Sequence, residues 1–410
     1  MTTSMMYEYK AKDRSGKVLS GELEAASSAA VAKTLRARGM LPLSVGEKKA
    51  SALQKELKIP GFGGRIKQKE VALMSRQLAT MVNSGLTLIR SLSILEDQSE
   101  NPTLKEIIGK VRTTVEQGVS LSAALDGHPK AFSPLYVSMV RAGEVGGALD
   151  ETLTRLADTL EAGARLRSQI KSAMAYPVVV LNLIVFIVIA MLVFVVPIFE
   201  KMYADLGGTL PLPTQSLINT SRFITSKWWM ILVVVGALIY AFKRWKKTEA
   251  GSRRWDATKL RFPVFGKLTQ KVAISRFART FSVLSRTGVP VLQTLDIVAE
   301  TAGNATVSDA VLEVQASVKR GESLAQPLEQ HDVFPPMVTQ MMAVGEETGA
   351  LDAMLGKVAD FYDREVEDTV NALTSLIEPI LIVVMGVVVG GILISLYLPM
   401  FNIANLIQSG

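Results

Sequence analysis

Residues 169–197 read QIKSAMAYPVVVLNLIVFIVIAMLVFVVP, and this stretch decides the fold. From Val178 to Val196 only Asn182 is polar. At about 1.5 Å per helical residue, a run of this length crosses a hydrocarbon core about 30 Å thick. A core helix of a soluble protein is seldom apolar on every face. The stretch therefore predicts a membrane-spanning helix, and we place this first span at 174–197.

Tyr176 and Pro177 stand where this span is expected to enter the membrane. A proline in the first turn of a helix forfeits no intrahelical hydrogen bond, so Pro177 costs little there. A second, shorter apolar segment at 228–242 is flanked by tryptophans, as expected at a membrane interface.

A third span is predicted at 378–399. Glu378 and Pro379 are expected at its entry, because a carboxylate at the bilayer centre costs about 2.5–3.5 kcal/mol on insertion scales. The sequence therefore predicts three spans in all.

The basic run from Lys243 to Arg261 sets the predicted orientation of the chain. Loops rich in Lys and Arg stay in the cytoplasm, so the residues after the second span are expected there. The N-terminal half is then cytoplasmic, 198–227 is a periplasmic loop, and the tail at 400–410 is periplasmic. This run also explains the formal net charge of +7 without nucleic-acid binding.

Composition excludes several kinds of chemistry. The chain of 410 residues has no Cys and two His, which removes disulfides and thiolate sites and leaves no plausible zinc site. There is no phosphate-binding loop, no His-Glu-x-x-His and no Gly-x-Ser-x-Gly. We therefore expect neither a cofactor nor an enzymatic activity.

Residues 1–46 are expected to form a small unit of their own. Alternating apolar residues, an alanine-rich helical stretch and a closing strand pattern predict a ββαβ domain over 1–46, with a turn at Ser15-Gly16. Residues 47–66 are interpreted as a linker. Its segment Pro60-Gly61-Phe62-Gly63-Gly64 is not expected to bind nucleotide, because no strand precedes it and no Gly-Lys-Ser/Thr ends it.

An internal repeat organises the remainder of the chain. Helical patterns at 67–171 and 271–374 match, and a span follows each of them. The second span returns the chain to the cytoplasm, so that both copies have the same orientation. The predicted fold is mainly α: a polytopic membrane protein with three transmembrane helices, two homologous cytoplasmic helical bundles and a small α+β N-terminal domain. Its register rests on these aligned pairs: Arg76 with Arg279, Gly85 with Gly288, Gly118 with Gly321, Pro177 with Pro379, and Pro197 with Pro399.

One motif, Gly-Glu-x-x-Gly-x-Leu-Asp, occurs in each copy. As a helix–turn–helix corner, its glycines permit a tight backbone and its Asp lies near the N-terminus of the next helix, where a carboxylate is favourable. The alternative is a contact surface for an ATPase or a cation. We favour the corner, which predicts that replacing either Glu by Gln leaves folding nearly unchanged. The motif residues are Gly143, Glu144, Gly147 and Asp150, and Gly345, Glu346, Gly349 and Asp352.

The chain resembles the GspF/PilC family, the platform proteins of type II secretion systems and type IV pili, over nearly its whole length. The segment from Gln169 through Tyr176-Pro177 to Pro197 is similar to the family's signature around the first span. Ile184 departs from it, where a small residue or Val is usual. Residues 263–267 and 396–401 resemble the pilus branch in particular.

This resemblance implies a non-enzymatic platform in the bacterial inner membrane. Such a platform would link a cytoplasmic hexameric ATPase to pilin or pseudopilin subunits, beside inner-membrane alignment proteins, and would form a homodimer. The F protein of a secretion system or of a competence pseudopilus is the alternative. A small transporter, suggested by Asn182, Glu378 and the repeat, is disfavoured because transporter repeats lie largely within the membrane.

Overall fold

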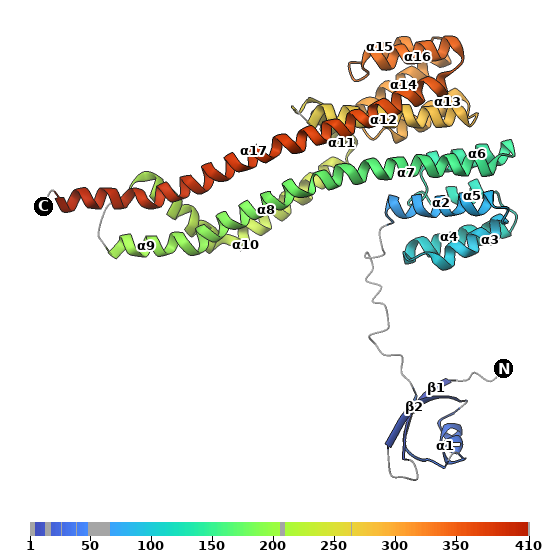
Figure 1. The fold of residues 1–410 in the computed structure, drawn as a ribbon, viewed down its shortest axis with the longest axis horizontal. Coiled ribbons are helices and arrows are strands. Elements are labelled where there is room, and N and C mark those ends of the chain that lie inside the picture. Colours follow the sequence, from blue (N-terminus) through green and yellow to red (C-terminus); the bar gives the residue numbers. More distant parts are fainter. Residues whose placement is uncertain are drawn as a thin grey trace. The chain divides into compact units, whose positions relative to one another are not determined.

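The computed structural model describes residues 5–12, 18–25, 27–37, 39–47, 66–205, 210–263 and 265–408. The chain divides into two units, Met1–Arg65 and Ile66–Gly410, and each is described by itself (Figure 1). The predicted turn at Ser15-Gly16 and nearly all of the predicted linker lie outside the described residues.

The N-terminal unit is a three-stranded antiparallel sheet with one helix, in the predicted ββαβ order. Tyr7 and Ala11 of the central strand form one buried cluster with Val31 and Leu35 of the helix. Alternate strand positions and i, i+4 helix positions therefore supply its core. Its elements are β1 (Met5–Lys12), β2 (Val18–Ala25), α1 (Ser28–Ala37) and β3 (Leu41–Glu47).

The first bundle of the second unit contains six helices. Its apolar residues recur at helical spacing, so that Val71, Met74 and Leu78 of α2 are buried together. Leu284, Val289 and Ile297 of the second bundle belong to the same cluster, and the two bundles therefore share part of a core. The helices are α2 (Gln68–Asn83), α3 (Leu88–Gln98), α4 (Pro102–Glu116), α5 (Leu121–Asp126), α6 (Pro134–Gly146) and α7 (Leu149–Ala173).

The second bundle repeats the first helix for helix. Leu78 and Phe281 occupy matching buried positions, as do Ile108 and Val311. An additional helix, α11 (Glu249–Arg261), precedes it. The matching helices are α12 (Phe265–Arg286), α13 (Val291–Thr301), α14 (Ala305–Lys319), α15 (Ala325–Glu329), α16 (Pro336–Thr348) and α17 (Leu351–Gln408).

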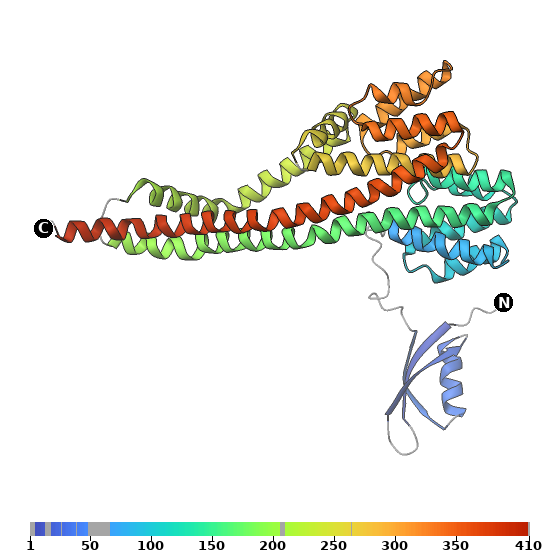
Figure 2. The same ribbon diagram turned by 45° about the horizontal axis from the view of Figure 1, so that its top comes forward.

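The last helix of each bundle leads directly into an apolar segment. In the first copy, α7 is followed by α8 (Ala175–Ala190), the π-helical turn η1 (Met191–Val195) and α9 (Val196–Asp205). In the second copy, α17 extends through its apolar segment and lies beside α7 and α8 (Figures 1 and 2).

Among the residues that the structure describes, three helices are long and apolar enough to cross a membrane, within Leu149–Tyr203, Leu212–Lys247 and Leu351–Pro399. The protein is therefore a multi-pass membrane protein, as the sequence predicts.

The predicted loop at 198–227 is mostly helical. α9 continues to Asp205, and α10 (Leu212–Lys247) begins where Pro211-Leu212-Pro213 had suggested an irregular segment. Prolines are tolerated in the first turn of a helix, and here they mark its start. Lys227 has non-helical dihedral angles (φ −116°, ψ 20°), and this kink separates a hydroxyl-rich half of α10 from its apolar half.

Low hydropathy concealed the first half of α10, in which Leu217, Ile218 and Ile224 pack inward whereas Leu212 and Phe223 are exposed. Ile218 packs with Leu192 of η1 and Ile392 of α17 in one cluster. The C-terminal segment also differs from the prediction: α17 shows no break near residue 374 and remains helical to Gln408.

Candidate functional site at the bundle corners and span entries

The repeated motif forms the same corner in both bundles. Gly147 has φ 68° and Gly349 has φ 69°, a left-handed conformation in which a side chain is strained. The amide of Ala148 donates to the Gly143 carbonyl at 3.0 Å, and Ala350 donates to Gly345 at 2.9 Å. These i→i−5 bonds close α6 and α16 in Schellman motifs. The corner interpretation therefore accounts for both copies.

Gly143 and Gly345 serve a different purpose from the two left-handed glycines. A Cβ at Gly143 would lie 2.8 Å from the Cβ of Thr152, and one at Gly345 would lie 3.0 Å from the Cα of Leu351. Both glycines are buried. They allow each penultimate helix to approach the following long helix more closely than any side chain permits.

The motif glutamates bind backbone amides of another helix. The Glu144 carboxylate accepts from the Leu121 amide at 2.5 Å and from the Ser122 amide at 3.0 Å. Both oxygens of Glu346 accept from the Leu324 amide, at 3.0 and 2.9 Å. The first amides of a helix have no intrahelical partner, and a carboxylate satisfies them with charge-assisted bonds. We therefore revise the expectation that Gln at these positions is nearly neutral.

The motif aspartates begin the long helices. Asp150 lies in the first turn of α7 and is exposed. Asp352 lies in the first turn of α17, with its Oδ2 atom 3.1 Å from Arg286 Nε. Both positions favour a carboxylate next to a helix N-terminus. A partner contact at the corner remains a proposal.

The two span-entry prolines have different surroundings. α7 ends at Ala173 and α8 begins at Ala175, so Pro177 lies in a first helical turn beside the exposed Tyr176. Pro379 instead lies inside the continuous helix α17, and its place at the entry of the third span stays a prediction. Glu378 is exposed on that helix. An interior proline removes one backbone hydrogen bond, here the one that residue 379 would otherwise donate to the carbonyl of Ser375.

The prolines at the far ends of the spans leave carbonyl groups without helical partners. The Val196 amide bonds to the Met191 carbonyl, and the next residue, Pro197, has no N–H to offer Leu192. The hydroxyl of Ser221 on α10 donates to that Leu192 carbonyl. An unsatisfied backbone group in hydrocarbon costs several kcal/mol, so this bond compensates for the proline.

The second copy meets the same need with another hydroxyl of α10. Pro399 cannot donate to the Ser395 carbonyl, four residues before it, and the Thr214 hydroxyl donates there instead. Tyr203 of α9 donates to the neighbouring Leu396 carbonyl. Sequence analysis missed these hydroxyls, because nothing local in the hydroxyl-rich half of α10 identifies their distant acceptors.

A repeated ion-pair cluster joins the first and last helices of each bundle. Arg76 Nε lies 2.7 Å from Glu161, and its Nη2 also contacts Asp158. In the second bundle, Arg279 Nη2 lies 2.7 Å from both Asp360 and Asp363. Hydrogen bonds from the arginine to Glu161 and Asp158 raise the pKa of Arg76. The aligned arginines were visible in the sequence, but their acidic partners lie more than 80 residues away.

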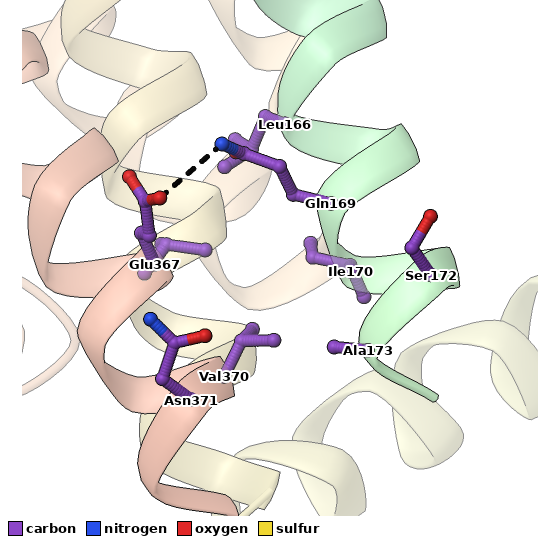
Figure 3. Close-up of a pocket in the computed structure, with 9 residues that line it drawn as sticks. Leu166, Gln169, Ile170, Ser172, Ala173, Glu367, Val370 and Asn371 are labelled. Atoms are coloured by element: carbon purple, nitrogen blue, oxygen red, sulfur yellow. Dashed lines mark hydrogen bonds between the residues drawn. The ribbon is translucent and has the colours of Figure 1, made fainter. Parts of the chain in front are cut away.

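The signature residue Gln169 contacts the other repeat. It lines a cavity of about 360 Å³ between α7 and α17, and its Nε2 donates to Glu367 Oε1 at 3.4 Å (Figure 3). Asn371, its counterpart in the second copy, lines the same cavity. Gln169 therefore lies at the contact between the two long helices, close to where α8 begins.

A duplicated unit of helical bundle plus span thus defines the class of protein, and comparison with known families agrees with it. The model of the type II secretion system (T2SS) protein F matches residues 74–197 and again 277–399, and the model of its N-terminal domain matches residues 4–46. The chain belongs to the type II secretion system protein F family. This finding confirms the resemblance and the repeat.

Relatives in this family match almost the whole chain. The type IV pilus assembly protein PilC of Myxococcus xanthus is 44% identical over 400 residues, covering 98% of this chain and 95% of the relative. The PilC protein of Thermus thermophilus is 45% identical over 399 residues, covering 97% and 98%. The type II secretion system protein F of Vibrio cholerae is 36% identical over 404 residues, covering 98% and 99%.

Proposed function

We propose that this protein is the inner-membrane platform of a type IV pilus assembly machine. It couples a cytoplasmic ATPase to the insertion and extraction of pilin subunits and performs no catalysis of its own. Identity supports the pilus branch over the secretion branch: the Myxococcus and Thermus pilus proteins are 44% and 45% identical, and the Vibrio secretion protein is 36% identical.

The observation that carries this proposal is the continuity between bundle and span. α17 runs from Leu351 to Gln408 as one helix, and α7 passes into α8 through Met174, which keeps right-handed helical dihedral angles (φ −80°, ψ −7°). A movement imposed on either bundle is therefore transmitted along a stiff helix into the membrane. A platform that moves pilins with cytoplasmic force needs such a connection.

Partner surfaces follow from what the structure leaves exposed. The carboxylates of Glu144 and Glu346 are occupied by backbone amides, so contact with the hexameric ATPase at the corner falls to exposed neighbours such as Asp150. Pilins and inner-membrane alignment proteins meet the spans, and the working form is a homodimer.

The proposed orientation has the N-terminus in the cytoplasm and the C-terminus in the periplasm. The chain lacks cysteine, so single cysteines report on topology directly. Leu212→Cys, at the exposed start of α10, should react with a membrane-impermeant maleimide from the periplasm, whereas Arg253→Cys should not. Labelling in the reverse pattern would contradict the orientation.

Deleting the gene in its own bacterium tests the function. We expect cells without surface pili that keep normal amounts of pilin in the membrane, and recovery of pili when the gene is restored. Co-purification of the pilus ATPase with the full chain should accompany this recovery. Intact pili with loss of a secreted protein would instead assign the chain to the secretion branch.

A further inference from the structure

A large cavity lies between the two bundles where they meet the first span. It has a volume of about 1060 Å³, with α7 and the start of α8 on one side and α12 on the other. Met174, Ala175 and Val178 extend its wall to the beginning of the apolar segment. A molecule in this cavity can therefore continue along the span into the membrane.

Positive charge dominates the lining of this cavity. Its cations are Arg167, Lys171, Arg276 and Arg279, and its one carboxylate is Asp363. Arg279 is bound to Asp360 and Asp363. Within the described part of the chain, Arg167 bonds only to the neutral Gln68, at 2.9 Å, and neither Lys171 nor Arg276 has a hydrogen bond or an ion pair. Three cations thus share one cavity without a carboxylate partner.

The internal repeat shows that the fold does not need these charges. The position of Arg276 is taken in the other copy by Leu73, which is 59% exposed. The positions of Arg167 and Lys171 are taken by Thr369 and Leu373. Residues that only maintain the bundle would be expected to recur in both copies, as the corner glycines do.

One residue of the lining, Gly163, also differs between the two copies. Gly163 of α7 lines the cavity, and no atom lies within 4 Å of where its Cβ would stand. The matching residue in α17 is Glu365, which pairs with Lys271 at 2.7 Å. A glycine inside a helix costs about 0.5–1 kcal/mol relative to alanine. The open space is therefore maintained against helix propensity.

We propose that this cavity binds an anionic phospholipid of the cytoplasmic leaflet, with its phosphate held by Arg276, Arg167 and Lys171. The acyl chains then follow Met174 and Val178 along α8. The choice of leaflet rests on the orientation proposed above. Guanidinium groups bind phosphate oxygens through paired hydrogen bonds, and basic pockets beside spans are suited to anionic headgroups.

The electrostatics of Arg276 agree with an anionic ligand. Arg276 is exposed as a whole, but desolvation of its charge by the surrounding protein lowers its pKa, and the nearby charge of Arg167 lowers the pKa further. A bound phosphate would offset both effects. Asp363 is the carboxylate that faces this site, and its oxygens are already bonded to Ser275 and Arg279.

Binding is tested with the full chain, purified and delipidated in a neutral detergent. Dioleoyl phosphatidylglycerol or dioleoyl phosphatidylcholine is titrated into the micelles, and retained lipid is counted by native mass spectrometry. We expect phosphatidylglycerol to bind at least tenfold more tightly than phosphatidylcholine. Arg276→Gln should reduce this preference about tenfold.

Two further variants separate binding from folding. Gly163→Leu places a bulky side chain in the cavity without changing charge and should abolish the preference while keeping the melting temperature of the unliganded protein. Arg165→Gln removes a cation from the same helix, 76% exposed and outside the lining, and should leave the preference intact. If Arg276→Gln fails to fold, the lipid preference of Gly163→Leu still tests the proposal.

Several results would overturn the proposal. Equal binding of the two lipids, or an unchanged preference in Gly163→Leu, would remove the site. If soluble glycerol phosphate binds as tightly as phosphatidylglycerol, the site binds free phosphate and not a lipid headgroup. If an acidic peptide binds in place of the lipid, the site is a peptide site. Because the assay uses purified protein, its outcome is independent of whether the chain serves pili or secretion.

Discussion

The two repeats share a scaffold and differ in what lies between them. Both close their penultimate helix with a left-handed glycine, both cap a short helix with a glutamate, and both clamp the first helix to the last with an arginine. The inter-bundle cavity has Gly163 and three unpaired cations, two from the first copy and Arg276 from the second, and the position that matches Gly163 holds Glu365, which pairs with Lys271. Repeated features maintain the bundle, whereas the features that differ are candidates for function.

Substitutions at the close crossing of the penultimate and last helices should destabilise the protein most. Gly143→Val and Gly345→Val force a side chain into contacts of 2.8 and 3.0 Å, and overpacking of this kind costs on the order of 3 kcal/mol. The contact at Gly345 is with backbone, which yields less than the side chain of Thr152, so Gly345→Val should be the worse. Melting temperatures of the full chain in detergent measure both.

Gly146→Val is the matched control for this pair. No atom lies within 4 Å of a Cβ at Gly146, and the second copy has the β-branched Thr348 there. A melting temperature lowered as much by Gly146→Val as by Gly143→Val would show that helix propensity, and not close approach, sets the cost.

Substitutions of the capping glutamates should have the next largest effect on stability, and this effect should differ between the two copies. Glu144 serves two amides with two oxygens, so Glu144→Gln turns an amide donor toward an N–H and should cost about 2 kcal/mol. Glu346 directs both oxygens at one amide, and Gln can keep that bond through its carbonyl, so Glu346→Gln should cost less than about 1 kcal/mol.

Thermal unfolding, with the exposed Glu347→Gln as control, separates the two substitutions. Equal losses of melting temperature in Glu144→Gln and Glu346→Gln would show that the two capping glutamates do not differ. If Glu144→Gln is stable yet abolishes pili, the corner is also a partner surface.

The left-handed glycines should respond alike. Gly147→Ala and Gly349→Ala each place a side chain at φ near 68–69°, which costs about 1–2 kcal/mol, and neither meets a neighbouring atom. Asn tolerates this conformation, so Gly147→Asn should recover most of the lost melting temperature. A large difference between the two Ala variants would mean that something besides the backbone angle acts at one corner.

The smallest effects are expected at the hydroxyls that satisfy the proline-orphaned carbonyls. Ser221→Ala and Thr214→Val each remove one interhelical bond, and such bonds in membrane proteins contribute about 0.6 kcal/mol on average. Thr220→Val is the control, because Thr220 bonds only to its own helix, at Ser216. Effects no larger than those of the control would show that the carbonyls find other partners.

Part of the candidate site was accessible from the sequence. The left-handed glycines, the aspartates at the helix starts and the signature residue Gln169 were all identified from the motif pattern or from the resemblance. The partners of Glu144, Arg76 and Gln169 were not, because each lies between 22 and 198 residues away. The same limit hid the cavity, whose lining joins residues of α7 with residues of α12 that are far away in the chain.

The sequence by itself determined the spans, the repeat, the ββαβ order of the first domain and the family. Hydropathy, helical period and strand alternation are local properties, and they follow from residues close together in the chain. Tertiary structure alone decided that residues 212–227 are helical, that Pro379 lies inside an unbroken helix and that η1 is a π-turn closed by Ser221. Each of these depends on a distant residue that buries an apolar side chain or satisfies a backbone group, and no local pattern records which residue that will be.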